Sequence, residues 1–191
     1  MKRSRKSGNW FRTARESRSS PDIMSPIGHL TISYVSSRTF FRNLSLTALL
    51  VGGVLPDIDF LFLFFKWFNQ AHRVVSHNLL FILTASLFAA AVSDKGQKKA
   101  AGLSLLAGGM LHLMIDSVMD INPTNGIGIA LFWPFSDKFF SPFNILNPSL
   151  NLAGWSNPMG MVRTLIPGLL YEIPFYIIAA ILFFRQKRTC P

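Results

Sequence analysis

Four histidines and a few aspartates are the residues of this sequence whose types and spacing could do chemistry. His112 and Asp116 are four residues apart, so on a helix they lie on one face, one turn apart. Asp57 and Asp59 follow Pro56, where a local bend could bring both carboxylates towards one point. Imidazole nitrogens and carboxylate oxygens together are a common ligand set for a divalent metal such as zinc. We therefore predict a metal site built from histidine and aspartate.

The remaining ligand types are scarce in this chain. Cys190 is the only cysteine, so neither an intrachain disulfide nor a thiolate cluster can form. Glu172 is the only glutamate beyond the N-terminal arm, and it could either join the site or be solvated near a helix start.

The composition indicates a membrane protein. Half of the 191 residues are hydrophobic and 15% are charged, whereas a soluble domain carries about 25% charged residues. Five apolar segments are expected, at 27–41, 44–55, 74–93, 100–120 and 163–184. The last three reach the roughly 20 residues of a full membrane span, and the first two are shorter. We predict an all-α integral membrane bundle of about five membrane-embedded helices, multi-pass in the cell (inner or plasma) membrane.

An alternating path through the bilayer brings the candidate ligands to one end of this bundle, here called end A. The first segment leaves end A, the second returns, the third leaves, the fourth returns and the fifth leaves. A single membrane histidine is more often a packing residue than a ligand, but the agreement of separate sequence regions favours a polar functional centre. The residues that this path places at end A are His29, Asp57, Asp59, His72, His77, His112 and Asp116.

The chain divides into an arm, a helical domain and a tail. Residues 1–25 are rich in Ser and Arg and lack apolar periodicity, which predicts a disordered basic arm. Residues 26–186 form the predicted membrane domain, in which 121–161 is a long loop with tryptophans that suit a membrane interface. Residues 187–191 are a short basic tail.

Five short motifs follow one another along residues 24–136: Gly28-His29-Leu30, Leu55-Pro56-Asp57-Ile58-Asp59, His72-Arg73-x-x-Ser76-His77, His112-x-x-x-Asp116 and Leu131-Phe132-Trp133-Pro134-Phe135. Their order resembles the YdjM-like family of predicted membrane-bound metal-dependent hydrolases. That family usually has threonine where this chain has Ser76. The pattern is also similar, more distantly, to zinc-dependent phospholipase C and related nucleases.

The resemblance implies a set of roles for these residues. One or two divalent metals, with zinc expected, would be bound by His29, Asp57, His72, His112 and Asp116. An activated water would attack an ester or phosphoester, and the location indicates a lipid or lipid-linked substrate. The catalytic candidates are Asp59 as a base or as an orienter of a ligating histidine, Arg73 as the holder of a phosphate or carboxylate, and His77 as a ligand or proton shuttle.

Two other interpretations use the same features. A transporter subunit or an ion-responsive membrane protein could use the same His and Asp centre without catalysis. The net charge of +10 would suit a nucleic-acid binder, but +5 of it belongs to residues 1–25. A basic arm beside a membrane more often meets anionic lipid head groups. We therefore expect membrane lipids as partners and no specific nucleic acid.

The arm also decides the predicted orientation, because lysine and arginine favour the cytoplasmic side. The opposite end, end B, has eight such residues, and end A has four without the arm and eleven with it. The run Met24-Ser25-Pro26-Ile27-Gly28-His29 is similar to the short N-terminus typical of the family. We expect translation to start at Met24 and end A to face away from the cytoplasm.

Overall fold

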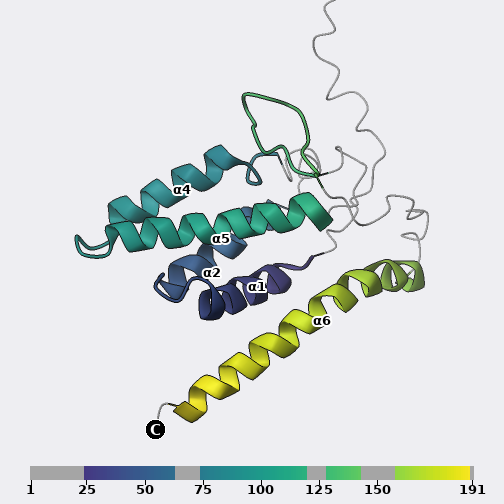
Figure 1. The fold of residues 1–191 in the computed structure, drawn as a ribbon. Coiled ribbons are helices and arrows are strands. Elements are labelled where there is room, and N and C mark those ends of the chain that lie inside the picture. The colour runs from purple at the N-terminus through teal and green to yellow at the C-terminus, as the bar shows by residue number, and fades with distance from the viewer. Residues whose placement is uncertain (1–23, 63–73, 120–127, 143–157, 190–191) are drawn as a thin grey trace, which may run out of the picture.

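The computed structural model describes residues 24–62, 74–119, 128–142 and 158–189 (Figure 1). Within these residues the only β-structure is an isolated bridge between Ile129 and Phe140. The all-α prediction is therefore confirmed for the described part of the chain. The predicted arm up to residue 23, and most of the predicted 121–161 loop, lie outside it. The helices are α1 (Pro26–Thr39), α2 (Leu46–Val54), the 3₁₀ helix η1 (Leu55–Phe62), α4 (Leu79–Val92), α5 (Lys98–Met119) and α6 (Pro158–Thr189).

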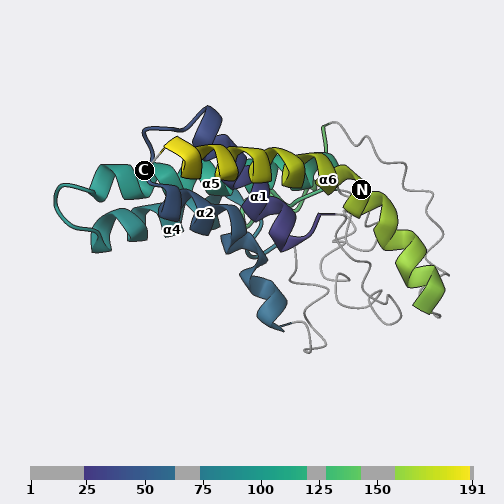
Figure 2. The same ribbon diagram turned by 90° about the horizontal axis from the view of Figure 1, so that it is seen from below.

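The helices pack as a row with α5 and α2 in the middle (Figure 1). Helix α5 contacts both α4 and α2, while α1 contacts both α2 and α6. Figure 2 shows the bundle from below, with α6 lying along α1 at the edge of the row. The first two predicted segments form the short helices α1 and α2, and the polar hairpin between the third and fourth is present after Ser93, where α4 ends.

Capping side chains fix where three of the helices begin. The side-chain oxygens of Ser25, Ser45 and Asn78 accept hydrogen bonds from backbone N–H groups in the first turns of α1, α2 and α4. The cap at Asn78 delays α4 until Leu79, so this helix has 14 residues rather than the full span predicted for 74–93. Residues 74–78 form a turn instead, because the Asn78 side chain binds the backbone on both sides of it.

One helix within the described residues, Lys98–Val118, is long and apolar enough to cross a membrane, and α4 is a shorter apolar helix. Helix α5 has 22 residues, and its length of about 33 Å matches a hydrocarbon core of about 30 Å. Lys98 lies in its first turn, and His112 and Asp116 lie in its last turns, roughly 21 and 27 Å away along the axis. This helix therefore runs from the predicted basic end B to the predicted end A.

The described part of the chain has an apolar exterior and a polar interior. More polar than apolar side chains are buried in it, including three histidines and three aspartates. Exposed apolar side chains are Leu83, Leu87, Phe88 and Val92 on α4, Met110 and Met114 on α5, and Ile173, Ile177, Ile181 and Phe184 on α6. Such extensive apolar exposure suits contact with lipid rather than with water.

Glycines let α2 and α5 approach until their backbones touch. A Cβ atom on Gly52 would lie 2.2 Å from the carbonyl oxygen of Leu105, and one on Gly108 would lie 2.1 Å from that of Leu49. Backbone atoms cannot move aside as a flexible side chain can. The crossing of these two helices therefore requires glycine at both positions.

We expect Gly108→Ala to destabilise the protein by about 1–3 kcal/mol, because the added methyl forces the two backbones apart. Thermal unfolding of the purified protein in detergent measures the effect. Gly96→Ala is the matched control, since a Cβ atom there meets nothing within 4 Å. Equal melting temperatures for the two variants would contradict the close-packing argument.

Candidate metal centre

Helix α5 supplies His112 and Asp116 to a buried cluster. Nε2 of His112 lies 3.1 Å from Oδ2 of Asp116, one turn further along the same face. Nδ1 of His112 lies 2.9 Å from the carbonyl oxygen of Gly53, across the glycine-lined crossing with α2. Because a carbonyl oxygen only accepts, Nδ1 of His112 carries the proton that it donates there. In the neutral ring, Nε2 is then left with a lone pair aimed at the carboxylates.

The 3₁₀ helix η1 sends its two aspartates in different directions. A 3₁₀ helix turns by about 120° per residue, so side chains two positions apart do not share a face. Oδ1 of Asp57 lies 3.6 Å from Nε2 of His112 and 3.5 Å from Nε2 of His77. Asp59 instead accepts a hydrogen bond from Ser76 at 2.7 Å. The two carboxylates therefore do not meet at one point, as the bend after Pro56 suggested they could.

The turn of residues 74–78 places His77 opposite α5. The Asn78 side chain donates to the carbonyl oxygens of Val74 and Val75 at 2.7 and 2.8 Å. Its oxygen accepts from the backbone N–H of Phe81 at 2.8 Å. One side chain thus closes the turn and caps α4. His77 is fully buried as a result, and its Nε2 lies 3.3 Å from Oδ2 of Asp116.

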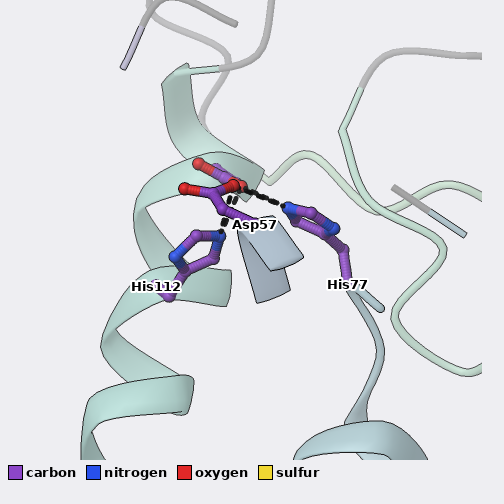
Figure 3. A group of neighbouring side chains, drawn as sticks. Asp57, His77 and His112 are labelled. Carbon is purple, nitrogen blue, oxygen red and sulfur yellow. Dashed lines mark ion pairs between the residues drawn. The ribbon is translucent and has the colours of Figure 1, made fainter. Parts of the chain in front are cut away.

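Four side chains from three separate parts of the chain therefore meet in one place. One ligand atom from each of Asp57, His77, His112 and Asp116 lies within 4.8 Å of the other three. Figure 3 shows the imidazoles of His77 and His112 pointing to the carboxylates from two sides. All four residues are at most 7% exposed. This group, here called the His/Asp cluster, could hold a metal ion.

The spacing within the cluster fits a small cation better than direct hydrogen bonds. The four nitrogen-to-oxygen distances are 3.1, 3.3, 3.5 and 3.6 Å. Hydrogen bonds between nitrogen and oxygen span about 2.7–3.2 Å, and three of the four distances exceed this range. Distances of this size leave room for a small cation between the donor atoms.

The charges within the cluster also call for a cation. Every ion pair that Asp57 and Asp116 make within the described residues is with a histidine. Oδ2 of Asp57 is buried and has no hydrogen-bond partner there. Burying ionised carboxylates away from water is costly unless they are paired or coordinate a metal. A divalent ion between these atoms would offset that cost.

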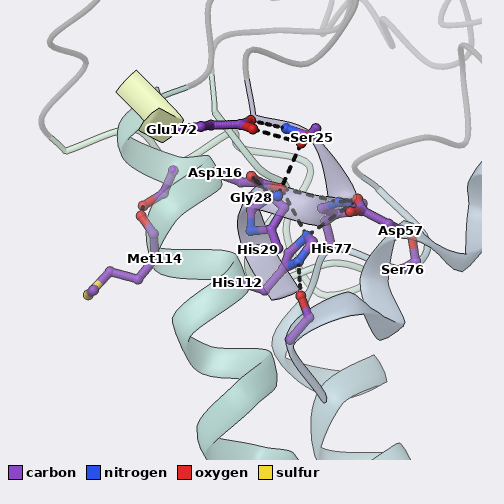
Figure 4. A network of polar contacts seen from close by, with 12 residues as sticks. Ser25, Gly28, His29, Asp57, Ser76, His77, His112, Met114, Asp116 and Glu172 are labelled. Atoms are coloured by element: carbon purple, nitrogen blue, oxygen red, sulfur yellow. Dashed lines mark hydrogen bonds and ion pairs between the residues drawn. The ribbon is translucent and has the colours of Figure 1, made fainter. Parts of the chain in front are cut away.

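His29 lies beside the cluster rather than within it. Its Nε2 is 3.0 Å from Oδ1 of Asp116, the oxygen that faces away from His77 and His112. Its ring stacks on that of His112 with centroids 3.8 Å apart (Figure 4). His29 therefore holds the second oxygen of a cluster carboxylate in this arrangement.

Of the residues selected from the sequence, the structure brings together His29, Asp57, Asp59, His77, His112 and Asp116 at end A. His72 and Arg73 lie outside the described residues, so their predicted roles stay predictions. Sequence reasoning named Ser76 only as a motif position without a role, and it missed Asn78. The sequence did contain a signal: Ser76 and Asn78 are polar residues that flank the candidate histidine His77 just before an apolar run.

Glu172 ties α6 to the start of α1 and is buried rather than solvated. Its two oxygens accept from the backbone N–H of Ser25 at 2.5 Å and from its hydroxyl at 2.8 Å. Tyr176 also donates to it, and Figure 4 shows the Ser25 contacts above His29. A Cβ atom on Gly28 would lie 2.8 Å from the Glu172 carboxyl group. Glu172 thus positions the helix that carries His29.

The sequence matches the family described as YdjM inner membrane protein over residues 24–188. No curated protein and no solved structure matches the chain. The match includes every described residue of the cluster and the whole of α5.

We expect Glu172→Ala to destabilise the protein by about 1–3 kcal/mol, because it leaves buried donors of Ser25 without an acceptor. Glu172→Gln keeps one acceptor oxygen, so its stability should lie between that of Glu172→Ala and that of the parent protein. Thermal unfolding in detergent checks the order, and a Glu172→Ala variant as stable as the parent would contradict the role of this contact.

We also expect zinc to raise the melting temperature of the purified protein. A ligand that binds only the folded state stabilises it by mass action, by about 2.7 kcal/mol at a hundredfold excess over Kd. The double variant Asp57→Ala/His112→Ala should lose this shift. Asp94→Ala, which removes an exposed aspartate at end B, should keep it. The same zinc shift in both variants would place the metal elsewhere.

Proposed function

The chain belongs to the YdjM inner membrane protein family, and from this premise we propose that it is a membrane-bound metal-dependent hydrolase acting on an ester or phosphoester of a lipid or lipid-linked substrate. The observation that carries the proposal is the convergence of two histidine nitrogens on two carboxylates at metal-ligand spacing.

The donor set supports zinc as the metal. Two imidazoles and two carboxylates provide four ligands of the types that zinc accepts. A bound divalent metal supplies Lewis acidity, which polarises the substrate oxygen and lowers the pKa of water. In this proposal Asp57, His77, His112 and Asp116 hold the metal. His29 keeps Asp116 in place, which is the kind of support that ligating carboxylates commonly receive.

A second ion could lie next to the first. Oδ1 of Asp116 points to His29 while Oδ2 points to the cluster, so this carboxylate could bridge two positions. His72 would complete such a position only if it approaches His29. Whether one or two ions bind is decided by the metal content of the purified protein.

The membrane location favours a lipid or lipid-linked substrate. His112 and Asp116 of the cluster lie in the last turns of the candidate span, so in this proposal the cluster would lie where a bilayer core gives way to head groups. The apolar flanks of α4, α5 and α6 would keep the protein multi-pass in the inner membrane. Arg73 would hold a phosphate group there by two parallel hydrogen bonds.

A non-enzymatic function is the second candidate, and the burial of the cluster favours it. His77 and His112 are at most 1% exposed, which suits a transporter or an ion-responsive protein that binds a cation without substrate access. Turnover separates the two functions, because both predict metal binding but only one predicts hydrolysis.

We expect the zinc-loaded protein in mixed micelles to hydrolyse bis(p-nitrophenyl) phosphate or a phosphatidyl lipid, and to stop after chelation. Restoring zinc should restore turnover. His112→Ala/Asp116→Ala should lower kcat/KM at least a hundredfold, because it removes two of the four ligands. Asp137→Ala is the control, since Asp137 is exposed outside the cluster. Stoichiometric zinc without turnover on any ester would support the ion-binding alternative.

A further inference from the structure

Ser76 stands between an aspartate that does not reach the His/Asp cluster and a histidine that does. Its hydroxyl donates to Oδ2 of Asp59 at 2.7 Å, and its Oγ lies 3.0 Å from Nδ1 of His77. The direct distance from Nδ1 of His77 to Oδ2 of Asp59 is 3.8 Å, which is too long for a hydrogen bond. Ser76 therefore connects Asp59 and His77 through one hydrogen bond to each.

The proton positions along this chain follow from the donor and acceptor types. An ionised carboxylate only accepts, so the single hydroxyl proton of Ser76 goes to Asp59. The Ser76 oxygen then presents a lone pair to His77, and Nδ1 of His77 must carry a proton to meet it. In the neutral ring the lone pair is on Nε2, the atom that faces Asp57 at 3.5 Å and Asp116 at 3.3 Å.

We propose that Ser76 is a positioning residue: it links Asp59 to His77 and holds that imidazole in the tautomer and orientation that bind a divalent metal. The inference rests on the proposed metal site and adds two residues to it. Metal-bound histidines almost always donate their other ring N–H to a carboxylate, a carbonyl or a water, and losing that partner commonly costs 10–100-fold in metal affinity.

The two cluster histidines then receive the same support from different sources. His112 donates its Nδ1 proton to the carbonyl oxygen of Gly53, and His77 donates its own to the hydroxyl of Ser76. In this proposal Asp59 acts through Ser76 as an orienter of His77, which is one of the two roles that the sequence left open for it.

Burial makes the hydroxyl hard to replace. Ser76 is 3% exposed and His77 is fully buried. The turn that carries both is closed by the Asn78 side chain. In Ser76→Ala the imidazole of His77 would lose this acceptor, and Ser76 would no longer hold its tautomer.

The test measures zinc affinity by chelator competition, and the absorption spectrum of the Co²⁺-loaded protein, for single variants in detergent. Ser76→Ala should weaken zinc binding 10–100-fold and alter the Co²⁺ bands. Ser76→Thr, which keeps the hydroxyl, should restore both to near the parent values. Ser86→Ala is the matched control, because Ser86 is also buried but donates to the backbone of Ile82. It should leave both readouts unchanged.

A double-variant cycle tests the linkage itself. Asp59→Ala combined with Ser76→Ala should bind zinc no more weakly than the weaker single variant, because both changes break one chain of contacts. Additive losses would overturn the linkage. If Ser76→Ala does not fold, Ser76→Cys, which keeps the side-chain size but bonds weakly, should show the same loss of affinity.

The outcomes separate this inference from the proposed function. A folded Ser76→Ala protein with the parent zinc affinity and Co²⁺ spectrum overturns the role of Ser76 and leaves the metal site standing. A parent protein that binds no metal overturns the proposed function itself. Equal losses in Ser76→Ala and Ser86→Ala would show a general packing effect and would also overturn the inference.

Discussion

The backbone contact between α2 and α5 is the constraint on which the site depends. Gly52 and Gly108 allow each helix to approach a carbonyl oxygen of the other, and this brings the Gly53 carbonyl to Nδ1 of His112. The same approach places η1, which continues directly from α2, beside the last turns of α5. Asp57 therefore reaches His112 because Gly52, which precedes Asp57, and Gly108, which precedes His112, let the two helices pack closely.

A divalent ion held by a buried cluster of this kind would couple folding to metal binding. The interior holds carboxylates balanced by histidines, while the helix flanks are apolar. The histidine nitrogens lie 3.0–3.3 Å from Asp116 and 3.5–3.6 Å from Asp57, so Asp57 is held beyond hydrogen-bond distance. Part of the binding free energy of a cation would offset the cost of burying these charges and would stabilise the fold. Supporting contacts such as Glu172 with Ser25 matter for the same reason, because they hold α1 and His29 against the cluster.

Much of this arrangement was predictable from the sequence, because apolar segments and ligand types are local signals. The structure confirms that His29, Asp57 and His112 meet at one end of the bundle, and the i, i+4 spacing correctly paired His112 with Asp116. The alternating path through the bilayer stays a prediction. The arm, His72 and Arg73 stay predictions, since they lie outside the described residues. The predicted length of α4 was wrong. Apolar residues at 74 and 75 suggested an earlier start, but the Asn78 cap makes the helix begin at Leu79.

The contacts that could not be predicted are those in which one small polar side chain acts on a distant segment. Ser76 and Asp59 are separated by 17 positions, and Glu172 and Ser25 by 147, so no spacing rule relates them. The glutamate was ambiguous in the sequence, because a lone glutamate near a helix start has a solvated interpretation of equal weight, and the serine was only a position in a motif. Burial removes that ambiguity: once water is excluded, each of these groups needs a partner within the protein, and finding it identifies the role. The polar residues of a membrane-protein interior are therefore the ones for which three-dimensional structure adds most to the sequence.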